Sequence, residues 1–143
     1  MSARQRMRTA VTILRLLPHY LRFARLRTSV PLDQLVEDAA SFGQTARPRR
    51  EEEARIVACI LRLHRLVGGR DDDCLPRSLL LYRELSRLGA DPVLSVGFRE
   101  DGGQIAGHAW VELRGHVVGE KSPERAFTRT VTFQPTRGRQ RRT

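Results

Sequence analysis

Cys74 and His108 have the residue types, and the order along the chain, that nucleophilic cysteine chemistry requires. Cys74 belongs to the segment DDDCLPRSLLLYRELSRL, residues 71–88, whose apolar residues recur at helical spacing. A thiol in the first turn of a helix meets unpaired backbone N–H groups and the positive end of the helix dipole, and both favour the thiolate. An acidic run precedes the thiol and acts in the opposite direction: Asp71, Asp72 and Asp73. Because cysteine is also a commonly buried residue, its position alone leaves a structural role open.

Two short segments downstream, 107–113 (GHAWVEL) and 116–120 (HVVGE), have the composition of paired β-strands. A three-residue connection would place His108 directly opposite Glu120. It would put Ala109, Val111, Leu113 and Val117 on one face of the hairpin, and His108, Trp110, Glu112, His116 and Glu120 on the other. A two-residue connection would place Glu120 opposite Ala109 and mix the two faces. We therefore predict the three-residue connection, since a slip of one residue moves every side chain to the other face.

These residues define a candidate triad of Cys74, His108 and Glu120. In such a triad a thiolate attacks a carbonyl, an imidazole carries the proton, and a carboxylate fixes the imidazole tautomer and stabilises its charged form. A strand histidine beside a glutamate can also be a purely structural hydrogen bond. His116, on the same predicted face of the hairpin, is a second candidate for the base.

The elements that must position the triad are helices before residue 90 and strands after it. The expected helices are Thr9–Leu26, kinked or split by Pro18, then Leu32–Ala40, a helix opened by Glu51–Glu53, and the cysteine helix; the expected strands are 93–98, 107–113, 116–120 and 131–133. Helices followed by strands predict an α+β fold with an antiparallel sheet. We divide the chain into an N-terminal helical region at 1–49, a core at 50–136 and a disordered basic tail at 137–143.

Helical spacing also predicts which residues face the core. In the first helix the expected inner face is Val11, Ile13, Leu14, Leu17, Leu21 and Ala24. In the third helix Cys59 lies in the apolar stripe, so we interpret it as structural, and we expect His64 at the helix surface.

The net charge of +10 lies mainly at the two ends of the chain. Residues 1–30 contain seven Arg and no acid, and residues 121–143 contain seven Lys or Arg against one Glu, so the ends carry +7 and +6 and residues 31–120 carry −3. No interleaved aromatic residues or nucleic-acid motif accompany the charge. The sequence therefore does not predict nucleic-acid binding.

Other functional classes are disfavoured by what the chain lacks. No apolar run approaches the roughly 18–20 residues of a membrane span, and no signal-peptide pattern is present, so we expect a cytoplasmic protein with no transmembrane segment. The two cysteines, Cys59 and Cys74, have neither metal-ligand spacing nor a disulfide framework. We expect no metal and no cofactor.

Two motifs carry a resemblance to a known family. CLPRSLLLYRELSRLGADPVLSVGFRED, followed by GHAWVELRGHVVGE, resembles the transglutaminase-like cysteine peptidases of lasso-peptide biosynthesis. More narrowly, the chain is similar to the stand-alone leader peptidase of systems in which a separate small protein recognises the leader. The resemblance covers residues 50–136 and implies a papain-like or transglutaminase-like fold, with the cysteine helix packed on an antiparallel sheet.

The resemblance implies that Cys74 is the nucleophile and His108 the general base and acid, while Glu120 takes the third position, where Asp is usual. It also implies three partners: a precursor peptide as substrate, a separate leader-binding recognition protein, and a lasso cyclase that uses the freed amine. The Cys74 backbone N–H is one candidate oxyanion donor, and the sequence identifies no second. The same residues also fit a transglutaminase or other acyl transferase, or a peptide-binding module with a silent thiol.

Overall fold

The computed structural model of the chain describes residues 1–40, 49–70, 73–121, 123, 126–136 and 139–140. These residues form helices first and strands second, as the sequence predicts. The elements are α1 (Ala3–Leu26), α2 (Leu32–Ala40), α3 (Arg50–Leu66), α4 (Cys74–Arg87), β1 (Val93–Asp101), β2 (Gln104–Leu113), β3 (His116–Val117), β4 (Thr128–Phe133), β5 (Pro135–Thr136) and β6 (Arg139–Gln140).

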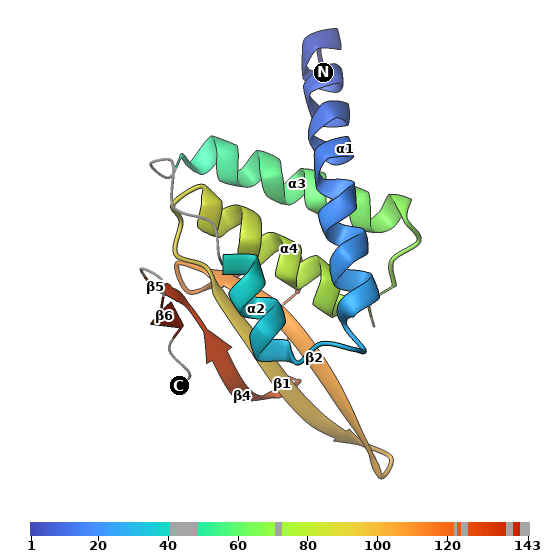
Figure 1. Cartoon of the computed structure of the whole chain (residues 1–143), viewed down its shortest axis with the longest axis vertical. Helices are drawn as coiled ribbons and strands as arrows, with labels where there is room; N and C mark the ends of the chain where they lie inside the picture. The colour runs from blue at the N-terminus through green and yellow to red at the C-terminus, as the bar shows by residue number, and fades with distance from the viewer. Residues whose placement is uncertain (41–48, 71–72, 122, 124–125, 137–138, 141–143) are drawn as a thin grey trace.

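The main sheet has four antiparallel strands in the order β3-β2-β1-β4, which confirms the predicted α+β class. Figure 1 shows the helices together on one side of this sheet, with α4 between the sheet and the other helices. β5 and β6 form a separate two-stranded pair, so residues 139–140 of the expected basic tail are in a short strand. The other residues of 137–143 lie outside the described part of the chain.

α4 is the centre of the fold. It contacts α1, α2, α3, β1 and β2, and almost every residue from Cys74 to Ser86 is buried. The three consecutive leucines, Leu79 to Leu81, are at most 1 % exposed although they point to different sides of the helix. A helix with apolar residues on several faces is stable only when other elements surround it. The position of Cys74 is therefore set by the whole core.

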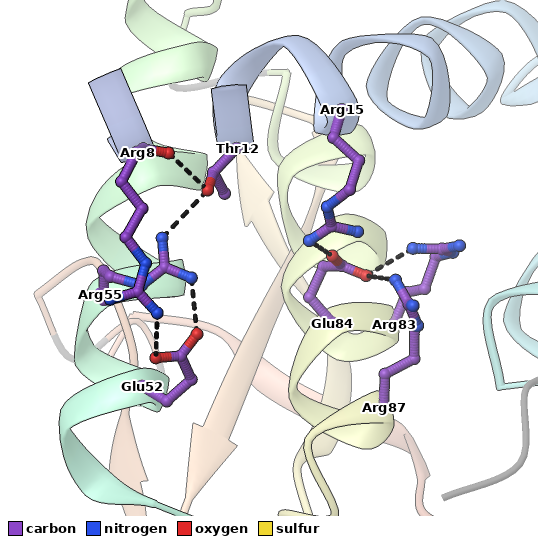
Figure 2. A network of polar contacts seen from close by, with 8 residues as sticks. All are labelled: Arg8, Thr12, Arg15, Glu52, Arg55, Arg83, Glu84 and Arg87. Carbon is purple, nitrogen blue, oxygen red and sulfur yellow. Dashed lines mark hydrogen bonds and ion pairs between the residues drawn. The ribbon is translucent and has the colours of Figure 1, made fainter. Parts of the chain in front are cut away.

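Polar contacts fix α1 onto α3 and α4 (Figure 2). The carboxylate of Glu84, which is 2 % exposed, accepts hydrogen bonds from Arg15 of α1 at 2.7 Å and from Arg87 at 3.3 Å, and it also pairs with its neighbour Arg83. On α3, Arg55 donates to the Thr12 hydroxyl of α1 at 3.0 Å. A buried carboxylate is tolerated because several cations and hydrogen bonds compensate it.

α1 differs from the prediction in its start and in its inner face. It begins at Ala3 because Ser2 forms a capping box with Gln5, through hydrogen bonds of 3.3 and 2.9 Å, and it continues through Pro18 as one helix. The expected inner face was wrong at its exposed members Val11, Leu14 and Leu21. The buried residues are instead Thr12, Leu16, Tyr20 and Phe23. The helix has two apolar faces, and the one that bears the large aromatic rings buries more surface.

His64 also differs from the prediction. It is 6 % exposed, and its Nδ1 lies 2.6 Å from the Tyr20 hydroxyl while its Nε2 lies 3.2 Å from the Arg70 carbonyl oxygen. Tyr20 is far from α3 in the sequence, and Arg70 lies beyond the end of that helix. Periodicity within α3 therefore could not reveal either partner. Cys59, in contrast, is 2 % exposed within the α3 stripe, as expected for a structural cysteine.

The register predicted for the hairpin between segments 107–113 and 116–120 was wrong. Leu113 pairs with His116 in β2–β3, so the connection has only two residues, Arg114 and Gly115. Both have positive φ, 52° and 79°, which is what a type I′ turn requires. The buried carboxylate of Glu53 on α3 accepts a 2.8 Å hydrogen bond from Arg114 and so stabilises this unusual backbone.

The strand lengths also differ from those predicted. β1 and β2 continue to a tight turn at Gly102 and Gly103, so both are longer than the predicted strands 93–98 and 107–113. In the other direction β3 ends at Val117, whereas the prediction continued to residue 120. The chain then turns at Gly119, which has φ of 80° and stands so close to Leu61 that an added Cβ would lie 2.9 Å from that side chain.

Candidate active site

The thiol of Cys74 lies in the first turn of α4, beside the strand residue that follows His108. The Ala109 N–H donates a hydrogen bond to Cys74 Sγ at 3.4 Å. One turn further along α4, the buried Ser78 hydroxyl donates to the Ala109 carbonyl at 2.9 Å. Two residues of α4 thus use both backbone polar groups of Ala109. This double contact fixes the N-terminal end of α4 against β2 and holds the sulfur near His108.

His108 and Glu120 are in direct contact even though they are not opposite each other in the sheet. His108 Nε2 lies 2.6 Å from Glu120 Oε2, and both side chains are mostly buried. Glu120 reaches the imidazole from the turn after Gly119, where its chain has already left β3. An ionised carboxylate only accepts hydrogen bonds, so Nε2 carries the hydrogen and Nδ1 is the nitrogen left for the thiol.

Arg77 completes the cluster and was not identified as a site residue from the sequence. Its guanidinium is 7 % exposed and donates to the second oxygen of Glu120, Oε1, at 2.9 Å. Cys74 and Arg77 lie three residues apart, on one side of α4. A single helix therefore supplies both the thiol and the cation that holds the carboxylate. The signal in the sequence was an arginine one turn after the cysteine, on the same side of the helix.

The pKa of the Cys74 thiol is lowered. Burial by itself raises it, but the hydrogen bonds from His108 and from the Ala109 N–H, together with the charges of His108 and Arg77, outweigh burial. The pKa of His108 is raised to about 9 by its hydrogen bonds to Cys74 and Glu120, against the opposing effect of burial. The two shifts act in the same direction, since each favours the thiolate–imidazolium pair over the neutral thiol and imidazole.

Aromatic rings surround the imidazole. His108 stacks on Phe127 with ring centroids 5.1 Å apart and on Trp110 with centroids 6.0 Å apart. Gly97, which pairs with His108 across β1–β2, leaves space for the indole, because an added Cβ would lie 2.9 Å from the Trp110 ring. Aromatic faces stabilise a cation, so this environment also favours the imidazolium.

Asp73, the acid directly before the cysteine, has less effect than the sequence suggests. Asp73 accepts a 2.6 Å hydrogen bond from Arg27 at the end of α1 and one from the Arg70 N–H at 3.2 Å. The Arg27 hydrogen bond, followed by that of Arg70, lowers the Asp73 pKa and compensates its charge. Asp71 and Asp72 lie outside the described residues.

His116 lies on β3 with its side chain exposed, whereas His108 contacts Glu120 and contributes to the lowered pKa of the Cys74 thiol. Within the described part of the chain, no group of three or more His, Cys, Asp or Glu residues is arranged to hold a metal ion. Of the helices described, none has the length and apolarity needed to cross a membrane.

The comparison with protein families gives one match. A family model described as transglutaminase-like superfamily matches residues 6–132, which include all of the residues described above for the site. The match starts within α1, well before residue 50, so the family domain includes the N-terminal helices. No curated protein and no solved structure matches the chain.

Proposed function

This chain belongs to the transglutaminase-like superfamily, and from this premise we propose that it is a cysteine peptidase with Cys74 as nucleophile, His108 as base and acid, and Glu120 as the orienting acid. Superfamily members are usually cysteine-dependent enzymes, either peptidases or acyltransferases. Two observations together carry the proposal: the strand residue after His108, Ala109, donates to the thiol, and His108 is joined through Glu120 to Arg77. A purely structural His–Glu pair has no need for a thiolate beside it.

The first half of the reaction forms an acyl-enzyme. The Cys74 thiolate attacks the scissile carbonyl carbon, and the carbonyl oxygen gains the negative charge of a tetrahedral intermediate. The imidazolium of His108 gives its proton to the leaving nitrogen, the C–N bond breaks, and the released fragment departs with a free amine. The Cys74 backbone N–H, which has no intrahelical partner in the first turn of α4, is suited to stabilise the oxyanion.

The second half consumes water. Neutral His108 removes a proton from a water molecule, the resulting hydroxide attacks the thioester, and the thiolate leaves, so the acyl fragment ends in a carboxylate. Glu120 stabilises the imidazolium in both halves, and Arg77 keeps the carboxylate in place. If an amine instead of water attacked the thioester, the same residues would perform acyl transfer.

We further propose that the substrate is a lasso-peptide precursor, and that the cut separates its N-terminal leader from the core. This step rests on the resemblance of the Cys-Leu-Pro-Arg and His-Ala-Trp-Val-Glu segments to the leader peptidases of that pathway class. The acyl fragment would be the leader, and the fragment with the new amine would be the core, which is the group that a lasso cyclase needs. A separate recognition protein would hold the leader and raise its local concentration at Cys74.

Mass spectrometry of a precursor peptide incubated with the purified protein tests this function, with and without the leader-binding protein and the cyclase. We expect two fragments whose masses sum to the precursor plus one water, with poor cleavage by the protein alone and a large gain with the leader-binding protein. An added primary amine identifies acyl transfer, since the leader fragment would then carry the amine in place of hydroxyl. An intact precursor in the presence of all partners would contradict both reactions.

A further inference from the structure

A second apolar stripe runs along the outside of α1. Its members, called the outer stripe below, are Met7, Val11, Leu14, Pro18 and Leu21, and the four residues other than proline are 69, 59, 68 and 51 % exposed. Their spacing alternates between four and three residues, which is the spacing of the a and d positions of a helix–helix seam. The core-facing residues of α1, such as Leu16 and Tyr20, lie on the other side of the helix.

The outer stripe continues onto a part of α1 that has little of the protein beneath it. Residues 1–8 are all exposed, and Figure 1 shows the N-terminal turns of α1 extending beyond the other helices. Single exposed apolar residues are common, but a regular row on a capped, projecting helix is typical of an interaction surface. Most helical stability in proteins comes from packing an apolar face against other elements. Within the described residues of this chain, the apolar face of the projecting turns has no such packing.

The charges around the outer stripe specify the chemistry of its partner. The d-type positions of the stripe are Met7, Leu14 and Leu21. An arginine follows each of them, and these three form one row beside the stripe: Arg8, Arg15 and Arg22. Each has an ion pair with an acid of its own chain, to Glu52 at 3.9 Å, Glu84 at 2.7 Å and Asp38 at 3.6 Å, yet each side chain stays at least 45 % exposed.

Two further arginines lie at the ends of the outer stripe. Arg4 and Met7 line a surface hollow at one end, and Arg25 and Leu21 line another at the other end. Because residues 1–30 contain no acid, every charged side chain that α1 itself contributes to the border of the stripe is positive.

We propose that the outer stripe binds an acidic amphipathic helix of a separate protein, which packs along α1 from Arg4 to Arg25. This interval corresponds to about 32 Å of helix, or about six turns. The partner would bring apolar residues to the seam and carboxylates to the arginines beside it and at its ends. The inference does not depend on the reaction at Cys74.

Two other occupants fit the surface less well. The α1 helix of a second copy carries the same arginines and no acid, so it cannot supply the complementary charge. A membrane-surface helix usually inserts a broad apolar face with aromatic residues, whereas this stripe is narrow and the aromatic residues of α1, Tyr20 and Phe23, are buried in the core.

The test uses the full chain and a displayed library of helical peptides of about 21 residues. The peptides have Leu at every a and d position and either Glu or Lys at every e and g position. We expect selection on the wild-type protein to enrich Glu, and the enriched peptides to bind Leu14→Glu at least about tenfold more weakly, because a carboxylate would be buried in the seam. The matched control is Leu66→Glu, at a 66 % exposed leucine at the end of α3, which should bind like the wild type.

Other results would overturn the proposal. These are enrichment of Lys, failure to enrich any peptide, or enriched peptides that bind both variants equally. Thermal unfolding monitors the fold of both variants, and an Arg4→Glu, Arg25→Glu double variant keeps the test valid if Leu14→Glu unfolds, since it should also weaken the Glu-rich peptides. Sedimentation with phosphatidylglycerol vesicles and sedimentation velocity examine the other occupants: vesicle binding or dimer formation that Leu14→Glu abolishes would assign the stripe to a membrane or a second copy.

Discussion

The two cysteines of this chain are almost equally buried and yet are opposite in their chemistry. Cys59 is 2 % exposed and Cys74 is 8 % exposed. Burial raises the pKa of Cys59, and the nearby Arg55 and Arg62 only partly oppose it. Burial also acts on Cys74, but there its pKa is lowered. Burial alone therefore does not decide whether a thiol is inert; the hydrogen bonds and charges that reach the sulfur decide it.

The difference follows from the position of each cysteine in its helix. Cys59 lies in the middle of α3, where the backbone N–H groups are used within the helix and the side chain packs among apolar neighbours. Cys74 is the first residue of α4, where the N–H groups have no intrahelical partner and a strand residue, Ala109, donates to the sulfur. The same residue type is a structural hydrophobe in one helix and a candidate nucleophile in the next.

The largest effect is expected from removal of each thiol in turn. Cys74→Ala should lower precursor cleavage by at least about a thousandfold, whereas Cys59→Ala should keep near-normal turnover and lose only stability, on the order of 1 kcal/mol. His108→Ala should match Cys74→Ala, and the double variant should be no worse, because the two act as one unit. Quantitative mass spectrometry of the cleavage products measures the turnover of these four variants. Near-normal turnover by Cys74→Ala would end the peptidase hypothesis.

A smaller loss is expected when the groups behind the imidazole are changed. Glu120→Gln and Arg77→Leu should each leave a slow but measurable enzyme, and Glu120→Ala a slower one, because His108 keeps its place but loses stabilisation of its charged form. The pH dependence separates this role from a structural one. The raised pKa of His108, about 9, sets the basic limb of the activity profile.

Loss of the Glu120 charge lowers the pKa of His108, so the basic limb should move to lower pH in Glu120→Gln. An unchanged limb together with a lowered unfolding temperature would assign Glu120 a structural role only. Full activity of both Glu120 variants would remove it from the triad.

The contrast between the thiols should also appear in their alkylation by iodoacetamide. A lowered pKa gives Cys74 more thiolate at pH 7 than a free cysteine has, so we expect it to react at least about tenfold faster than Cys59 in the folded protein. In His108→Ala the largest favourable contribution to the Cys74 thiolate is lost, while burial remains, so the advantage of Cys74 should decrease. Peptide mapping after short labelling times at pH 6, 7 and 8 measures both rates. Equal rates in the wild type would favour a silent thiol.

The smallest effect concerns the two histidines of the hairpin segment. His116→Ala should change turnover by less than about twofold, because its side chain is exposed on β3 and it is His108 that contacts Glu120. The same kinetic assay used for His108→Ala provides the comparison. If His116→Ala were inactive and His108→Ala active, the assignment of the base would be reversed.

The sequence predicted the elements of the fold better than their faces and registers. The order of helices and strands, the central α4 helix and the buried Cys59 follow from periodicity and composition, because these are local properties of the chain. The inner face of α1, the partners of His64 and the two-residue turn at Arg114 did not follow. In each of these cases the result depends on contacts with residues that are distant in the sequence. At the turn, for example, the Glu53 carboxylate of α3 accepts a hydrogen bond from the Arg114 guanidinium.

The contact between His108 and Glu120 was predicted from a register that proved wrong. The strand that was expected to carry Glu120 ends at Val117, and the turn at Gly119 brings the carboxylate to the imidazole from outside the sheet. The expected contact is present, but for a different geometric reason.

The sequence by itself determined that Cys74 opens a helix and that a strand histidine and then a carboxylate follow it, since helix starts, strands and turns depend on neighbouring residues. Only the tertiary structure decided that Ala109 donates to the thiol, that Arg77 holds Glu120, and that the outer stripe of α1 is left uncovered. The physical reason is that pKa shifts and exposed faces depend on which atoms packing brings together, and packing joins residues that lie far apart along the chain.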